Sequence, residues 1–362
     1  MRRYFGCWLL AVGCWLLAIG CLQAQPLPAP MKPGRTPEGV VYFLPKTVLH
    51  FHLLLEQQTF TPGEFARYAE RYLHRTDIAQ EPQTTYSISD IAIRQSAVRD
   101  TSKCFNVRLK GGKSETAEVH LSDDGILLSV NAEPITADSS CPFAIQKTKA
   151  NSQQTKANDV HRYLPPEILT AGSAAKKAEL TAQLIFELQE RRQQLITGEA
   201  EDLPQDEQQL RYMVSEIDRQ HQALMTLFTG STRRDTTIHM LTLCPEREMK
   251  REVLFRLSQR LGLVDKDDLA GIPYYITIED PNHTDTLKYT LPDGKKEGGF
   301  YVNQPGTVRL TLQREDQILS THTLPMAQFG FVTLRGGLLF KRYPTHLRLH
   351  PTTGAVEYLH AE

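Results

Sequence analysis

The sequence predicts an α+β protein in which two β-rich domains, the C-terminal one β-sandwich-like, flank a central antiparallel helical hairpin. Two amphipathic stretches lie between about Ser173 and Gly230, and short alternating segments with frequent turn residues lie on both sides of them. The expected divisions are a signal peptide (1–24), a flexible leader (25–38), an N-terminal β-rich domain with one helix (39–144), a polar linker (145–160), the helical hairpin (161–231) and the C-terminal β-sandwich-like domain (232–362).

The second helix of the hairpin has apolar residues at steps of three and four, which places them on one stripe. Asp206 and Glu207 put negative charge near the positive end of the helix dipole, and Gly230 suits the C-terminal end. The first helix ends at Gly198, so the connection is short and the helices are expected to be antiparallel. The stripe consists of Leu210, Met213, Val214, Ile217, His221, Leu224, Met225 and Phe228.

The positions of the apolar residues around the first helix predict how the hairpin packs on the rest of the protein. Leu184 and Leu188 lie on one face, and Phe186 lies about 200° around the helix from Leu184. We therefore expect this helix to be buried on two sides, by its partner and by a β-layer; an exposed Phe186 would instead favour a projecting hairpin. Ser173 and Lys176 have the Ser-x-x-Lys spacing of penicillin-recognising enzymes, but the other motifs of those enzymes are absent, and Ser173 is interpreted as a helix N-cap.

The N-terminus has the plan of a secretory signal peptide: Arg2 and Arg3 precede an apolar run that small residues follow. Three interpretations stay open. Plain cleavage before Gln25 ranks first, a lipobox that would lipidate Cys21 ranks second, and an uncleaved anchor ranks third. We expect an exported protein of the periplasm or the periplasm-facing outer membrane, attached to a membrane only through such an N-terminal lipid or anchor.

Three cysteines follow the signal segment. Cys104 and Cys141 lie in the same β-rich segment and are the candidate disulfide, which would leave Cys244 unpaired. The alternative is that all three are small buried residues. No Cys-x-x-Cys occurs, so a redox or zinc-finger motif is missing.

Strands are predicted throughout both β-rich regions. Val40–Leu44 and Lys46–Phe60 are expected as two strands around Pro45, and Thr237–Leu243 is expected to pair with Arg251–Ser258. The latter segment is interpreted as a strand, although Leu254, Leu257 and Leu261 also have the spacing of a helix. Within the second strand, Leu49, Phe51, Leu53 and Leu55 alternate with Val48, His50, His52 and Leu54. Turns are predicted at Asp124-Gly125 and, between two C-terminal strands, at Pro351–Gly354.

Seven blocks stand out along the chain: VVYFLPKT (40–47), FTPGEFARYAERYL (60–73), TAGSAAKKAE (170–179), LFTG (227–230), LGLVD (261–265), PYYI (273–276) and AQFG (327–330). Together these blocks resemble an exported protein family of Bacteroidota, domain-of-unknown-function family 4831. This resemblance implies an envelope location and the domain plan above, supports a strand at Arg251–Ser258, and implies no activity or site residue.

No complete catalytic, cofactor-binding or metal-binding motif is present, so we assign no catalytic or cofactor residue and expect no cofactor. His50 and His52 share one face of a strand and are weak candidates for a metal site without an identifiable third ligand. The formal net charge of −1 argues against nucleic acid as a partner, which would require a basic face.

The leading hypothesis is a non-enzymatic binding or assembly module of the cell envelope, with an envelope protein or glycan as partner. A periplasmic hydrolase acting on glycan or peptide is the second hypothesis, because paired catalytic carboxylates can meet in space without any local spacing. A structural lipoprotein is the third.

Overall fold

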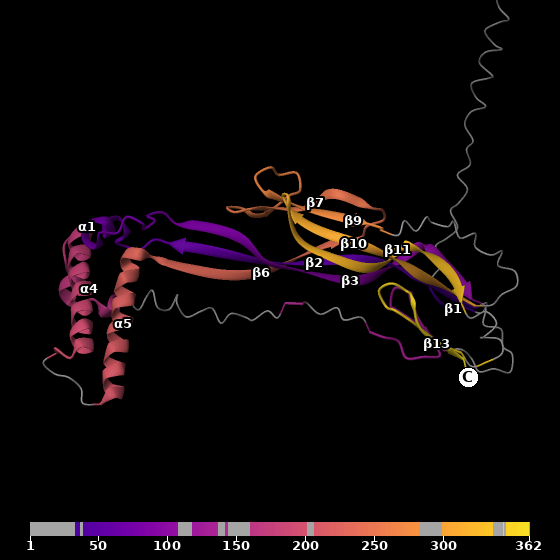
Figure 1. Cartoon of the computed structure of the whole chain (residues 1–362), viewed down its shortest axis with the longest axis horizontal. Helices are drawn as coiled ribbons and strands as arrows, with labels where there is room; N and C mark the ends of the chain where they lie inside the picture. The colour runs from indigo at the N-terminus through magenta and orange to yellow at the C-terminus, as the bar shows by residue number, and fades with distance from the viewer. Residues whose placement is uncertain are drawn as a thin grey trace, which may run out of the picture.

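The computed structural model describes residues 33–36, 39–107, 118–136, 142–143, 160–200, 206–281, 299–335, 343 and 345–361. The long strand β2 (Gly39–Thr61) organises the fold, because strands pair with it along both edges (Figure 1). At about 3.3 Å per residue, its 23 residues extend over roughly 75 Å. One edge pairs with β3 (Gln83–Val107); the other pairs with β1 (Gly34–Thr36) and, from Leu49 onward, with β6 (Ser231–Leu243). These antiparallel strands form sheet A.

The chain runs through Pro45 as one strand, so the prediction of two strands around this residue is wrong. Proline has no N–H for a ladder hydrogen bond and is tolerated in a sheet where the ladder is interrupted. The register supplies that interruption, because it changes from Phe43↔Cys104 to Pro45↔Arg99 and leaves a bulge in β3. On the opposite edge, the N–H of Phe43 donates to the carbonyl of Gly125 instead of to a neighbouring long strand.

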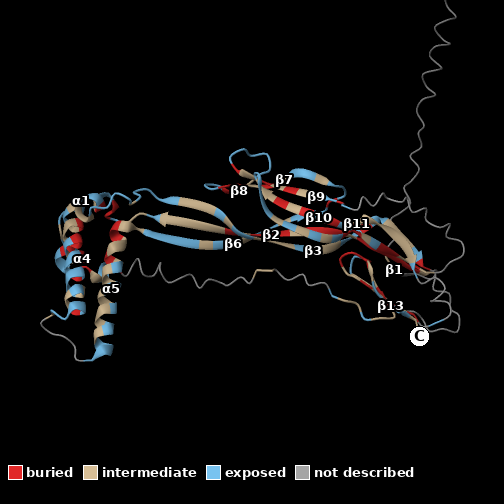
Figure 2. Ribbon diagram, viewed as in Figure 1, coloured by how far each residue is buried: buried red, intermediate tan, exposed pale blue. Residues whose placement is uncertain are grey.

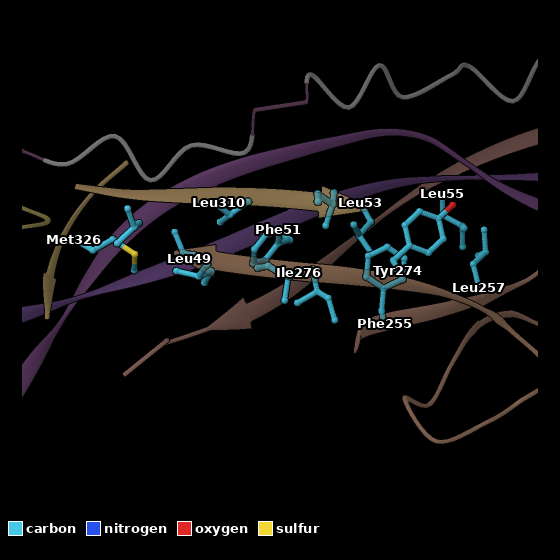
Figure 3. Packing of buried hydrophobic residues seen from close by; sticks show 14 residues of the cluster. Leu49, Phe51, Leu53, Leu55, Phe255, Leu257, Tyr274, Ile276, Leu310 and Met326 are labelled. Carbon is cyan, nitrogen blue, oxygen red and sulfur yellow. The ribbon is translucent and has the colours of Figure 1, made fainter. Parts of the chain in front are cut away.

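A second antiparallel sheet, sheet C, packs against sheet A. Phe51 and Leu53 of β2 are fully buried against Ile276 of β9 and Leu310 of β10 (Figure 3). The predicted alternation in β2 is therefore confirmed for Leu49, Phe51, Leu53 and Leu55. In spatial order, the strands of sheet C are β11 (Gln317–Arg335), β10 (Phe300–Arg314), β9 (Ile272–Glu279), β7 (Met249–Ser258) and β8 (Gly262–Val264).

The strand prediction for Arg251–Ser258 is confirmed by β7, but its predicted pairing with Thr237–Leu243 is wrong. The two segments belong to different sheets: β6 pairs with β2, whereas β7 pairs with β8 and β9. The connection at residues 244–248 therefore carries the chain from one layer of the sandwich to the other.

Sheet B lies near the C-terminal end of the molecule. It combines the predicted hairpin around Asp124-Gly125 with the predicted C-terminal hairpin, because Leu347 and Arg348 pair with Val130 and Ser129. Tyr42, Leu44 and Phe300 belong to the core beneath this sheet. In spatial order, its strands are β13 (Val356–Ala361), β12 (Thr345–Leu349), β5 (Leu127–Val130) and β4 (Val119–Leu121).

The two predicted β-rich domains do not have separate cores. β6, from the C-terminal region, extends a sheet of the N-terminal region, and β12 pairs with β5 across the same divide. The sandwich core likewise combines β2 with β7, β9, β10 and β11. A β-rich fold with several antiparallel sheets is thus confirmed, and the sandwich forms between the two regions rather than within the C-terminal one.

The helices gather at one end of sheet A, where we call them the helical tip (Figure 1). The predicted N-cap at Ser173 is present, because its side chain accepts a hydrogen bond from the N–H of Lys176. Asp206, predicted only as a negative charge at the helix dipole, is the N-cap of α5, and its side chain accepts a hydrogen bond from the N–H of Gln208. Gly198 and Gly230 adopt φ of 79° and 75° at the C-terminal caps. The tip contains α4 (Ala174–Thr197), α5 (Glu207–Thr229), α1 (Ala69–Leu73), α3 (Pro166–Leu169) and the 3₁₀ turns η1 (Ala66–Tyr68) and η2 (Val160–Tyr163).

The prediction that Phe186 is buried is wrong: this residue is 48% exposed. The tip core covers a neighbouring face of α4, where Ala178, Ala182 and Ile185 are buried, and within the described part of the chain no β-layer covers Phe186. Sheet A reaches the helices only through the ends of β2, β3 and β6, so the hairpin caps a narrow arm instead of lying on a broad sheet. The projecting arrangement is the observed one (Figure 2).

Part of the predicted plan lies outside the described residues, namely the signal peptide, most of the leader, the linker at 145–159, and Cys21 and Cys141. Within the leader, Gly34–Thr36 forms the short strand β1. None of the helices in the described part of the chain has the length and apolar character that a membrane-spanning helix requires.

Candidate functional site

The outer face of sheet A, which points away from sheet C, carries the two histidines that the sequence singled out. Because side chains alternate along a strand, burial of Phe51 and Leu53 against sheet C places His50, His52 and Leu54 on the outer face. We call this surface the histidine face. It comprises His50, His52 and Leu54 of β2, Asp90, Ala92, Arg94 and Ser96 of β3, and Ile238, Met240 and Thr242 of β6.

His50 contacts two hydroxyl groups from the neighbouring strands. Its Nε2 lies 2.6 Å from Ser96 Oγ, and its Nδ1 lies 3.2 Å from Thr242 Oγ1. A serine beside an imidazole that a third group orients is the arrangement of an activated nucleophile. Here the third group is a neutral hydroxyl, whereas a catalytic triad has a carboxylate that stabilises the imidazolium. The three residues come from three adjacent strands of one sheet face.

His52 is only 9% exposed although it lies on the outer face. Burial lowers the pKa of its imidazole, and the neighbouring His50 and Arg94 lower it further. The ring is therefore neutral at pH 7. A neutral ring can be covered by another surface without the cost of burying a charge.

The described residues contain no group of three or more His, Cys, Asp or Glu side chains that could hold a metal ion. Both ring nitrogens of His50 already contact hydroxyls, which further reduces its availability as a ligand. Cys104 lies in β3, where burial raises the pKa of its thiol. Its predicted partner Cys141 lies outside the described residues, so the disulfide stays a prediction.

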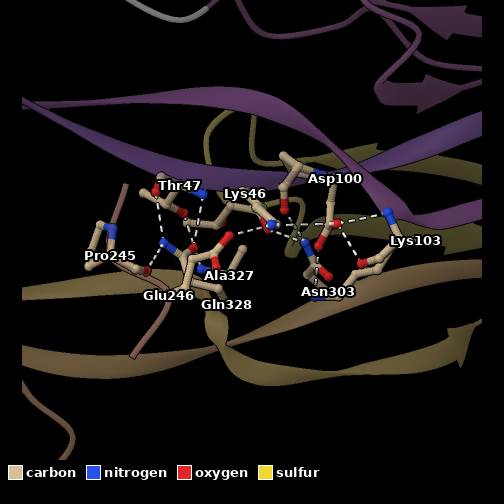
Figure 4. A network of polar contacts seen from close by, with 12 residues as sticks. Lys46, Thr47, Asp100, Lys103, Pro245, Glu246, Asn303, Ala327 and Gln328 are labelled. Carbon is tan, nitrogen blue, oxygen red and sulfur yellow. Dashed lines mark hydrogen bonds and ion pairs between the residues drawn. The ribbon is translucent and has the colours of Figure 1, made fainter. Parts of the chain in front are cut away.

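A second polar cluster occupies the bulge opposite Pro45 (Figure 4). The carboxylate of Asp100 is almost fully buried and accepts hydrogen bonds from the N–H and hydroxyl of Ser102, at 3.0 and 2.6 Å. Lys46 Nζ and Lys103 Nζ lie 3.9 and 3.7 Å from its two oxygens. A hydrogen bond to Glu246 raises the pKa of Lys46, whereas burial lowers that of Lys103. The cluster compensates a buried carboxylate and closes the bulge.

The side chain of Gln328 joins the two layers of the sandwich beside this cluster. Its Oε1 accepts from the N–H of Thr47 at 3.0 Å, and its Nε2 donates to the carbonyls of Thr47 and Pro245 at 2.8 and 2.9 Å. This stretch of β2 lies between the segments that pair with β1 and β6, so the amide satisfies backbone groups that no strand satisfies. The side-chain amide of Asn303 also satisfies backbone groups nearby, because its Nδ2 donates to the carbonyls of Pro45 and Thr353.

Sequence reasoning found His50 and His52 but missed Ser96, Thr242, Asp100 and Gln328. Alternation could have placed Ser96 and Thr242 on a common face of their strands. The register that brings them to His50 depends on pairing between segments 46 and 192 residues apart, for which the sequence has no local signal.

The blocks that resemble a known family also meet in space. The VVYFLPKT and AQFG blocks are joined by the hydrogen bonds between Thr47 and Gln328. The FTPGEFARYAERYL and LFTG blocks are joined where the N–H of Phe65 donates to the carbonyl of Leu227 at 2.7 Å. Each contact connects strands or helices that are distant in sequence, which makes these blocks structural joints of the fold.

No curated protein and no solved structure matches the chain. A family model described as a domain of unknown function, DUF4831, matches residues 38–357. The matched region extends from the start of β2 into β13, so it includes most of all three sheets and the whole helical tip. The chain therefore belongs to the DUF4831 family.

Proposed function

We propose that the protein is an exported component of the cell envelope that acts as a non-enzymatic binding or assembly module. The observation that carries this proposal is the display of the helical tip at the end of a long, narrow arm (Figure 1). Beyond Leu55, β2 continues with β3 and β6 on either side, and the core between sheets A and C no longer covers it. Such an arm holds the tip away from the body, as a spacer between a binding element and its support would.

The surface of the tip offers contacts to a partner. Phe186 is 48% exposed, Ile196 54% and Tyr212 69%, and Leu169 on the short helix α3 is 46% exposed. Aromatic side chains are enriched at protein interfaces because they bury large areas with little loss of conformational entropy. An envelope protein or a glycan is the class of partner that fits this surface and an exported protein.

Site-specific photo-crosslinking in cells tests the role of the tip. A photoreactive residue at Phe186 or Tyr212 is expected to form a discrete crosslinked species with an envelope component. The control is the same residue at Leu269, which is 85% exposed in the loop between β8 and β9. Crosslinking at all three positions alike, or at none of them, would remove the support for a binding tip.

Mass spectrometry of the mature N-terminus tests the location and separates two forms of the proposal. We expect a chain that begins at Gln25 and fractionates with the periplasm. An acylated Cys21 would instead support the structural lipoprotein, facing the periplasm from the outer membrane. A chain that retains residues 1–24 in the cytoplasm would contradict export.

One observation favours the hydrolase as a second candidate, namely the short distance between Ser96 Oγ and His50 Nε2. Labelling with a fluorophosphonate decides between the two, because this probe reacts only with activated serines. We expect no labelling, since Thr242 does not supply the negative charge that an imidazolium needs. Labelling that disappears in Ser96→Ala and His50→Gln, but persists in Ser87→Ala on the same strand, would establish the hydrolase.

A further inference from the structure

The two faces of sheet A in the body differ in what covers them. Sheet C covers the inner face, whereas the part of the chain that the structure describes places no further sheet on the histidine face. Met240 on this face is 58% exposed, and Ile238 and Leu54 beside it are half-buried. Contiguous apolar side chains on a sheet face indicate an interaction surface more strongly than single exposed residues do.

Two opposite charges lie on β3 at the border of this apolar patch. Arg94 is opposite His50 and Asp90 is opposite Leu54, so the two charges are equally far from the row formed by Met240, His52 and Ala92. Both side chains are exposed, and neither forms an ion pair with another described residue. The spacing of four residues separates them by about 13 Å along the strand, too far for a direct bond between them.

We propose that the histidine face is the interface of a two-fold symmetric dimer of this chain, with the axis along the row Met240–His52–Ala92. This deepens the assembly role proposed above and names a second copy as the partner. Rotation about this axis reverses the strand direction and places Arg94 of one copy opposite Asp90 of the second copy. Symmetry repeats the contact, so the dimer has two ion pairs that flank the apolar rows.

The alternative two-fold axis, parallel to the strands, would place β3 over β6. Arg94 would then face the neutral Thr242 of the second copy, and Asp90 would face Ile238. Only the axis across the strands pairs both charges. It also brings Met240 onto Met240 and the neutral ring of His52 onto itself, so no unpaired charge is buried at the centre.

The hydrogen bonds of His50 also allow a second copy of the chain to bury the histidine face. Burying a polar group without a partner is costly, but both nitrogens of this ring already contact Ser96 and Thr242. The face can therefore lose its water without leaving the imidazole unsatisfied. In the dimer, His50 would lie against the apolar side chain of Leu54 of the second copy.

Charge reversal with sedimentation velocity tests this interface. The purified protein is expected to be a dimer that dissociates on dilution. Arg94→Asp and Asp90→Arg should each weaken the dimer at least about tenfold, because each turns two attractions into two repulsions. The double variant Arg94→Asp/Asp90→Arg should recover the affinity, since it exchanges the charges and keeps the pairs. Met240→Lys should dissociate the dimer, and Leu269→Lys should not.

Circular dichroism of each variant shows whether its sheets remain intact, so a loss of dimer is separated from a loss of fold. A protein that is monomeric at every concentration would overturn the proposal, and so would a dimer that resists charge reversal. A double variant as weak as the single ones would contradict the proposed axis. Crosslinking at Phe186 and Tyr212 does not depend on this face, so failure here leaves the binding role of the tip standing.

Discussion

The body and the helical tip stabilise their parts of the chain in different ways. In the body, Phe51 and Leu53 are enclosed between two sheets, and the hydrophobic core includes residues from five strands. In the tip, Phe65 and Phe228 pack with ring centroids 5.6 Å apart in a smaller core between short turns and two long helices. Within the described residues, the ends of β2, β3 and β6 connect the two cores. The comparison indicates that the tip can loosen without the body unfolding.

A cavity in the body should have the largest effect. Phe51→Ala removes a fully buried ring between sheets A and C, and such substitutions cost about 3–5 kcal/mol. We expect the free energy of unfolding in urea to fall by this amount, with loss of protection from hydrogen exchange in every strand of sheets A and C. Gln58→Ala, in the arm portion of the same strand, should change it little. Loss of protection confined to the tip would contradict the separation of the two cores.

The tip has its own sensitive position at Gly63. A Cβ there would lie 2.2 Å from the carbonyl oxygen of Leu227, which belongs to the backbone and cannot rotate away. We expect Gly63→Ala to destabilise the tip by about 3 kcal/mol, the upper end for overpacking, and to break the hydrogen bond from Phe65 to Leu227. Hydrogen exchange should accelerate in α4 and α5 while β9 and β10 stay protected.

Gly172→Ala is the matched control for that experiment. Gly172 lies in the same tip, but a Cβ there would meet no atom within 4 Å. Its hydrogen-exchange pattern should therefore equal that of the unmodified protein. Equal acceleration in both variants would show that the tip responds to any added methyl group rather than to the close approach at Gly63.

Loss of the hydrogen bonds between Gln328 and Thr47, which join sheets C and A, should lower the free energy of unfolding by a smaller amount. Gln328→Ala removes one amide, which leaves the N–H of Thr47 without its partner and the carbonyl of Thr47 with a weak 3.9 Å contact from Cys244 Sγ, for a cost of about 2 kcal/mol. Gln328→Glu keeps the acceptor for the N–H of Thr47 but places a second acceptor against two carbonyls, so it should destabilise at least as much. Urea titration measures both, and stability equal to the unmodified protein would contradict this role of the amide.

How much of this comparison the sequence could predict depends on the range of the interactions. The caps at Ser173, Asp206, Gly198 and Gly230 were predictable because a cap forms between residues close in the chain. The alternation of β2 was predictable for the same reason. The placement of β6 beside β2, and of Ser96 beside His50, depends on long-range register. The prediction that a β-layer buries Phe186 was wrong because it assumed that a large aromatic side chain is covered. The narrow arm presents no broad sheet that could cover it.

The smallest effect we predict is a pH dependence that differs between the two regions. Burial lowers the pKa of His52 in the body, where His50 and Arg94 lower it further, and burial lowers that of His221 in the tip, where Arg192 acts in the same direction and Asp218 opposes it. Below the ordinary value of 6.5, the unfolded chain binds protons that the folded histidines do not bind. Stability should therefore fall as pH drops below 6.5, in both regions.

Substitution separates the two contributions. His52→Gln should remove part of the acid sensitivity of the strands of sheet A and leave that of α5 unchanged, and His221→Gln should do the reverse. Hydrogen exchange at pH 7.5 and 5.5, corrected for the intrinsic exchange rate, resolves the regions within one molecule. If either substitution changes the acid response of both regions equally, the two cores unfold together, and the arm couples them more tightly than its narrow connection indicates.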